Sequence, residues 1–298
     1  FRAYHKAYRY ATEFLDPCVR SYFVHHLGLV RYRQKDFASA AELIRQSLKI
    51  GSDCSYQRST LDRFMAKQGS FNSLILAYHK LGKLDSAVYF GERGLQYIEE
   101  GNLESSDSVY RRTARGVILG NLGGVKISQG KLLEAELLLK ESIRINDREG
   151  YAMEDAQSAR FKLANLFVLC GDVVAANETL DLAMRKLANL DVQGERMQRI
   201  SLSADQLRAK ILAMKGDTIG AFGYAQRYHS KNDSLEKMEV ELIATDLGSV
   251  FDSIDQEMKV SELDRDGRLK TIYLIASGLV LLFGLFCWNR ALGLLRKL

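Results

Sequence analysis

Proline is nearly absent from this chain of 298 residues, which carries a single one at Pro17. Runs of Val, Ile and Thr that favour strands are also few, whereas Ala, Leu, Glu, Lys and Arg, which favour helices, are abundant. Hydrophobic residues make up 47% of the chain, which excludes a disordered protein and suffices for a sizeable core. The composition therefore predicts an all-α fold.

The chain also lacks an excess of charge of one sign. Its 42 basic and 37 acidic residues leave a net charge of only +5, spread along the whole sequence. Proteins that follow a phosphate backbone carry a dense basic stripe, and no such stripe is evident here. We therefore expect no direct binding of nucleic acid by this chain.

Motifs of known catalytic chemistry are missing too. The sequence has no HExxH, no GxSxG, no phosphate-binding loop and no GxGxxG between a strand and a helix. His25 and His26 are adjacent, so on a helix they point to different sides and cannot hold one metal as residues i and i+4 do. The four cysteines have neither metal-ligand spacing nor a CxxC pair, and they do not settle the redox compartment. We expect no catalysis, no cofactor and no metal site.

One sequence motif occurs five times in the chain, for example as "QKDFASAAELIRQSL" and as "CGDVVAANETLDLAM". Each copy reads as the end of a helix, a turn and a new helix. The copies align on five turn residues at offsets of 47, 48, 41 and 45, and these are Lys35, Gly82, Gly130, Gly171 and Gly216. Glycine suits the turn because helices commonly end on a left-handed residue. This loose period predicts stacked helical hairpins.

Two columns of small residues accompany the turn. Five residues after it stand Ala40, Ala87, Ala135, Ala176 and Ala221. Seven residues before it stand Gly28, Ile75, Gly123, Ala164 and Ala209, of which only the isoleucine is large. Small side chains at both places allow the two helices of a hairpin to approach closely. We expect these columns to form the contact within each hairpin.

The small residue in the first helix, the Gly-Asp or Gly-Lys turn and the alanine in the second helix resemble the tetratricopeptide repeat (TPR) family. The resemblance implies a TPR-like, right-handed superhelical solenoid of about five hairpins over residues 18–232. Residues 1–17 would be the end of an upstream repeat or a capping helix. The period exceeds the usual 34 residues, which longer helices or linkers would explain, and the closing prolines are absent. Another helix-pair solenoid with about 40 to 47 residues per unit stays open.

First helices line the concave groove in this family and hold protein or peptide partners. The resemblance therefore implies a peptide groove lined by Tyr22, His25, Leu29, Tyr32 and Arg33 of copy one and Asn72, Leu76, His79 and Lys80 of copy two. The alternative interpretation is a partly solvated surface with ordinary packing. A clamp of lysines and asparagines for a terminal carboxylate is not reproduced across consecutive copies, so we do not predict one.

A different pattern follows the repeats. Across 233–270 apolar residues recur mostly at steps of three and four in a strongly charged background, which predicts an amphipathic connector helix. Such a helix can cap the solenoid or pair with a second copy in a homodimer.

Residues 271–289 contain no charged side chain. As a helix this segment measures roughly 28 Å, close to the hydrocarbon thickness of a bilayer. Tyr273 and Trp288 stand near its two ends, where amphipathic aromatics favour the membrane interface. We expect a single transmembrane helix in the lipid bilayer, followed over 290–298 by the start of a basic cytoplasmic helix.

Basic residues flank the segment on both sides, so charge does not decide its orientation. The order of repeat array, connector and span resembles the sensor region of bacterial membrane-anchored signalling proteins of the histidine kinase or helix-turn-helix regulator type. That resemblance implies a single-pass protein of the cell membrane, with a periplasmic or other extracytoplasmic solenoid and a cytoplasmic C-terminus. A kinase module of such a two-component system would lie outside this chain. The alternative is a tail-anchored cytosolic TPR adaptor that recruits protein partners to a membrane.

Replacing Leu281, near the middle of 271–289, with Arg tests the span. A central arginine costs about 2.5 to 3.5 kcal/mol on insertion scales, so Leu281→Arg should reduce the fraction of chain in carbonate-washed membranes. Leu281→Ile should leave that fraction unchanged. Recovery of the wild-type chain in the soluble fraction would contradict the span.

Overall fold

The computed structural model describes residues 17–52, 59–101, 107–190, 194–238, 240 and 267. The regular structure within these ranges is entirely helical. The chain divides into two compact units, and the one that spans Ala3–Leu242 contains the helical hairpins. The predicted span at 271–289, the basic segment at 290–298, residues 1–16 and most of the connector lie outside the described residues. Among the described helices, none is both long and apolar enough to cross a bilayer.

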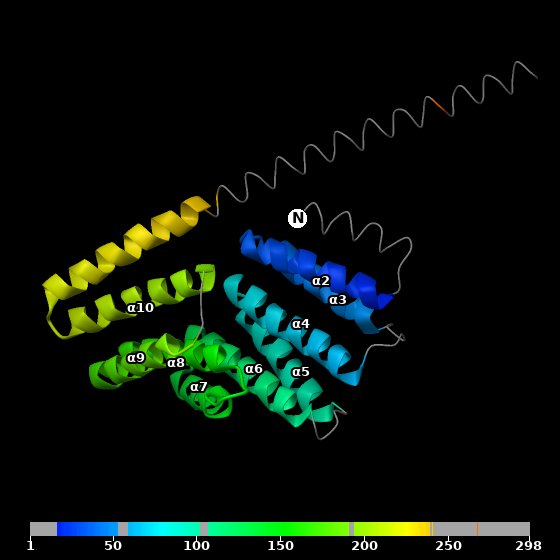
Figure 1. Ribbon diagram of the computed structural model, residues 1–298, viewed down its shortest axis with the longest axis horizontal. Coiled ribbons are helices and arrows are strands. Elements are labelled where there is room, and N and C mark those ends of the chain that lie inside the picture. The colour runs from blue at the N-terminus through cyan, green and yellow to red at the C-terminus, as the bar shows by residue number, and fades with distance from the viewer. Residues whose placement is uncertain are drawn as a thin grey trace, which may run out of the picture. The chain divides into compact units, whose positions relative to one another are not determined.

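The helices form antiparallel pairs in chain order (Figure 1). The pairs are α2 (Pro17–Arg33) with α3 (Phe37–Ser52), α4 (Thr60–Lys80) with α5 (Leu84–Glu100), α6 (Ser108–Ser128) with α7 (Leu132–Asn146), α8 (Met153–Cys170) with α9 (Val173–Ala188), and α10 (Gly194–Met214) with a helix over 218–238. Three first helices, α4, α6 and α10, are 21 residues long. Long first helices therefore contribute to a period above 34 residues.

Each hairpin closes through the same turn. The five turn residues have positive φ angles between 61° at Lys35 and 81° at Gly216. The amide of the next residue then donates to a carbonyl five residues back, as Asp172 N does to Phe167 O at 2.9 Å. This bond satisfies a carbonyl at the helix end. Lys35 is the one non-glycine among the described residues with positive φ.

Small residues hold the two helices of each hairpin together. Ala40, Ala87, Ala135 and Ala176 are fully buried. A Cβ added to Gly123 would lie only 2.6 Å from Leu139 Cγ, so the glycine is needed for close packing.

The rest of the two small-residue columns follows the same packing, with two exceptions near the end of the array. Gly28 and Ala164 are buried, and the large Ile75 is buried in the same cluster as Ala87. Ala209 and Ala221 are only half-buried, because they belong to the last described hairpin.

The core is a series of clusters between neighbouring hairpins. One cluster joins Phe64 and Ile98 to Ile118, and so connects α4 and α5 to α6. Another joins Leu180 of α9 to Ile211 of α10. Each hairpin thus packs mainly on its neighbours, as expected for a solenoid.

Ala135→Leu should overpack the contact between α6 and α7. We expect a loss of about 1 to 3 kcal/mol in the free energy of unfolding, measured by chemical denaturation. Ala38→Leu is the matched control, because Ala38 is exposed on α3 and the same change there should stay within about 0.5 kcal/mol. Equal stability of the two variants would contradict the repeat register.

Candidate functional site

Polar side chains connect consecutive first helices. Asn121 Nδ2 of α6 donates to Asn72 Oδ1 of α4 at 2.5 Å. Lys162 Nζ of α8 donates to Asn121 Oδ1 at 2.8 Å and to the carbonyl oxygen of Gly120 at 3.0 Å. We call Asn72, Asn121 and Lys162 the first-helix ladder. It crosses three hairpins on the helices that line the groove in TPR-like solenoids.

The ladder retains donors after its own bonds are made. An amide nitrogen carries two N–H groups and an ammonium carries three. Within the described part of the chain, Lys162 uses two of its three, Asn121 uses one of its two, and the amide nitrogen of Asn72 uses none. These N–H groups can bind carbonyl or carboxylate oxygens of a partner.

Burial perturbs the charge of this surface. It lowers the pKa of the Lys162 ammonium to about 8, although Asp155 nearby favours the charged form. The ammonium is therefore mostly charged at pH 7 and loses its proton as the pH rises through about 8. A partner carboxylate would favour the charged form and raise this pKa.

His79 adds a second bond between α4 and α6. Its Nε2 lies 2.7 Å from Ser128 Oγ. The pKa of His79 is lowered by burial and, to a smaller extent, by the positive charges of Lys162 and Lys80. His79 is therefore neutral at pH 7 and belongs to the same surface as the ladder.

The other predicted groove residues do not gather at one place. Tyr22 and His25 line a cavity between α2, α3, α4 and α5. Tyr32 packs against a core cluster, with its ring 5.2 Å from that of Phe37.

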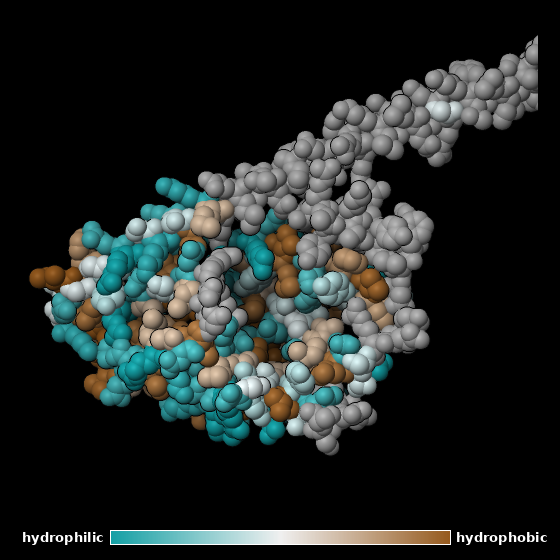
Figure 2. Space-filling view, in the orientation of Figure 1, coloured by the Kyte–Doolittle hydropathy of each residue, from teal (hydrophilic) through white to brown (hydrophobic). Residues whose placement is uncertain are grey.

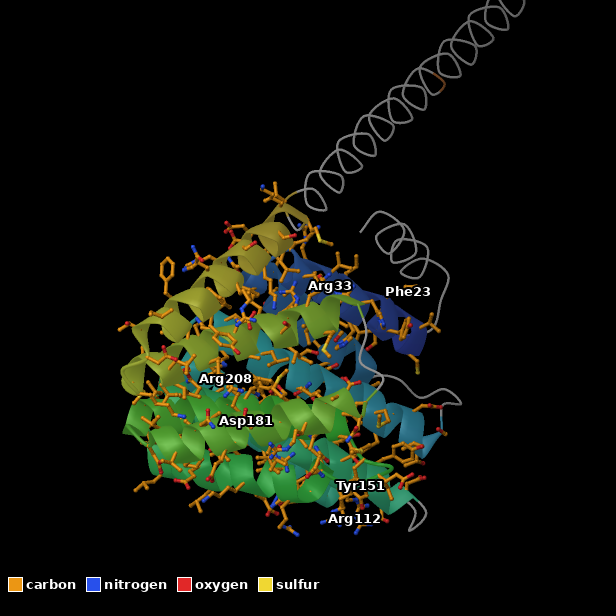
Figure 3. The ribbon with its side chains drawn as sticks, turned by 60° about the vertical axis from the view of Figure 1, so that its left-hand side comes forward. Phe23, Arg33, Arg112, Tyr151, Asp181 and Arg208 are labelled. Atoms are coloured by element: carbon orange, nitrogen blue, oxygen red, sulfur yellow. The ribbon has the colours of Figure 1, made fainter. Side chains whose placement is uncertain are left out.

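Leu29 and Leu76 are half-buried, and Lys80 is exposed at the end of α4. Arg33 is exposed at the end of α2 (Figure 3). Of the predicted groove residues, Asn72 and His79 contact the neighbouring first helix α6, and His25 of α2 contacts Ser70 of the neighbouring first helix α4.

The sequence reasoning missed Asn121 and Lys162, although a signal for them existed. Both stand nine residues before the turn of their copy, at Gly130 and Gly171. Residues in the same repeat position lie side by side on neighbouring first helices. Asn72 stands ten residues before the turn at Gly82, so only the bond between Asn121 and Lys162 follows from a shared repeat position.

A second polar group has a structural use. Arg208 of α10 and Asp181 of α9 lie next to each other (Figure 3) and form an ion pair. Arg208 Nη1 also donates to Asn177 Oδ1 at 2.9 Å. These charges hold α10 against α9. Over the face shown in Figure 2, hydrophilic side chains are interspersed with hydrophobic ones, which is typical of a protein surface.

The described ranges offer no candidate metal site. They contain no group of three or more His, Cys, Asp or Glu side chains placed to hold an ion.

No protein-family model and no curated protein matches the chain. Among solved structures it is similar to BtubC (BKLC) from P. vanneervenii, with 22% identity over 79% of this chain and 89% of that one and a TM-score of 0.56. A putative kinesin light chain with nearly identical TPR-like repeats from Podosopora anserina has 20% identity over 74% of this chain and 97% of that one, with a TM-score of 0.47.

The quorum sensor NprR from B. thuringiensis, in its apo form, has 11% identity over 76% of this chain and 79% of that one, with a TM-score of 0.28. A TM-score below about 0.5 does not support a shared fold. The similarity to BtubC, at 22% identity, supports a shared fold but not a shared function. The chain is accordingly a TPR-like helical solenoid.

Proposed function

We propose that this chain is the non-catalytic, extracytoplasmic sensor region of a membrane signalling protein, and that its first-helix ladder binds a peptide or protein. The TPR-like fold suits protein–protein interaction, because stacked hairpins present an extended surface. The observation that carries the proposal is the row of unused N–H donors on Asn72, Asn121 and Lys162.

The chemistry of the ladder selects the partner. Amide and ammonium donors spaced along one surface complement a segment rich in acceptors, namely extended backbone carbonyls together with an Asp or Glu side chain. Hydrogen bonds to a charged group contribute more than neutral ones, about 1.5 to 3 kcal/mol each. We therefore propose an extended acidic peptide segment, with its carboxylate at Lys162.

Signal relay needs more than binding. A partner shifts a conformational equilibrium only if it binds two arrangements with different affinity. In the proposed sensor, a peptide on the ladder would change how the hairpins stack, and the connector at 233–270 would pass that change to the span at 271–289. A homodimer formed through the connector would supply the two arrangements.

Peptide selection tests the ladder. A random-peptide phage library is selected on the full chain, and enriched peptides are measured by fluorescence anisotropy. Acidic peptides should be enriched, and Lys162→Gln, which keeps a donor but removes the charge, should weaken them by about tenfold or more. Wild-type affinity should fall as the pH rises through the pKa of Lys162, because the charged form binds, while Lys162→Gln should show no such fall.

Lys140→Gln is the control. Lys140 is an exposed lysine of α7 that pairs with Glu136 at 2.6 Å, so its loss removes one positive charge away from the ladder. This variant should bind as the wild type does. Equal weakening by the two variants would contradict the ladder as the binding site.

A further inference from the structure

The cavity between α2, α3, α4 and α5 has a volume of about 760 Å³. This lies within the range of small-molecule sites, roughly 300 to 1,000 Å³. Its walls come from the first half of α2, the last turns of α3 and α5, and the first turns of α4. It is distinct from the first-helix ladder, none of whose residues lines it.

A comparison of the repeats explains why the cavity exists. Sixteen residues after the turn, copies two to four carry Ile98, Asn146 and Leu187, each at most 1% exposed. The same position in copy one is Gly51, which lines the cavity. Copy one therefore lacks the buried side chain that copies two to four carry at this position.

A second glycine opens the facing wall. A Cβ added to Gly69, in the middle of α4, would meet no atom within 4 Å. A glycine inside a helix costs roughly 1 kcal/mol relative to alanine. The close contact with Leu139 explains why a glycine stands at position 123. No packing contact explains the glycine at position 69. A larger residue at Gly69 would therefore reduce this space, whereas a Cβ at Gly51 would lie only 3.0 Å from Ser21 Oγ.

Aromatic side chains form the apolar part of the lining. Phe64 is buried, and its ring stacks on that of Tyr97 with centroids 5.8 Å apart. Tyr22 lines the cavity from α2. This apolar part of the wall suits the apolar body of an aromatic ligand.

The polar part of the lining favours negative charge. Among the described lining residues, Arg63 and Lys67 are accompanied by one carboxylate, that of Asp62, which accepts a hydrogen bond from Ser59 Oγ at 2.8 Å. Lys67 Nζ stands 4.6 Å above the ring of Tyr97, so charge and aromatic surface adjoin. His25 lies 3.1 Å from Ser70 Oγ, and burial lowers its pKa to about 4, which leaves it neutral at pH 7.

We propose that this cavity is a binding site for a small aromatic anion, with the ring against Phe64 and Tyr97 and the anionic group near Arg63 and Lys67. Such a site joins copies one and two, so its occupant stabilises the junction of the first two described hairpins. It adds a small-molecule input to the solenoid and does not depend on peptide binding at the ladder.

Saturation-transfer NMR with 2-naphthoate on the full chain tests the site. The wild type should give a transfer signal, and Gly69→Leu, which fills the open space, should weaken binding by about tenfold or more. Gly69→Leu should melt no lower than the wild type, because the site has room and leucine favours the helix. Lys67→Met should weaken 2-naphthoate more than the neutral analogue 2-naphthylmethanol.

Gly223→Leu is the matched control. Gly223 is a helical glycine away from the cavity whose added Cβ also meets nothing within 4 Å. This variant should bind 2-naphthoate as the wild type does. Absence of a signal with the wild type, or unchanged binding by Gly69→Leu, would overturn the proposal.

Discussion

The close approach of two helices around a left-handed turn is the contact on which the rest of the structure depends. A positive φ at the turn residue reverses the chain within a few residues, and the buried alanine five positions later then meets the small residue of the first helix. The separation is set by van der Waals contact, as Gly123 and Leu139 show. Larger residues at these places would separate the helices and disrupt the clusters between hairpins.

Because the described hairpins share the same turn, equivalent positions such as Asn121 and Lys162 on neighbouring first helices lie side by side. Residues that share a repeat position can therefore form one continuous surface across several hairpins. Asn121 and Lys162 form their bond for that reason, although 41 residues separate them in the chain. The cavity lies where the repeat pattern is broken, since copy one has Gly51 at a position that carries a buried side chain in copies two to four.

The sequence was sufficient to predict the helical hairpins, because their turn and packing residues recur at fixed spacing and act locally. It was insufficient for contacts that depend on the angle between hairpins. Asp147, just after α7, accepts hydrogen bonds from Arg160 at 2.6 Å and from Gln157 at 3.2 Å, and this lowers its pKa. These residues occupy different repeat positions, so no column in the sequence indicates their contact.

The candidate site was only partly predictable for the same reason. Asn72 and His79 were identified as groove residues by their place on a first helix, and both contact α6. Tyr22 and His25 were assigned to the same groove, but they line the cavity. Its existence depends on the absence of side chains at Gly51 and Gly69, and periodicity gives no information about an unfilled space.

The side of the membrane on which the solenoid lies separates the proposed sensor from the adaptor, and Cys170 offers a direct measurement because it is free and exposed. Spheroplasts that express the chain are treated with a membrane-impermeant maleimide, alongside the Cys170→Ser variant. The account predicts that intact spheroplasts label the wild type and that the label at Cys170 is lost in the variant. Labelling of Cys170 only after lysis would place the solenoid in the cytosol and contradict the account.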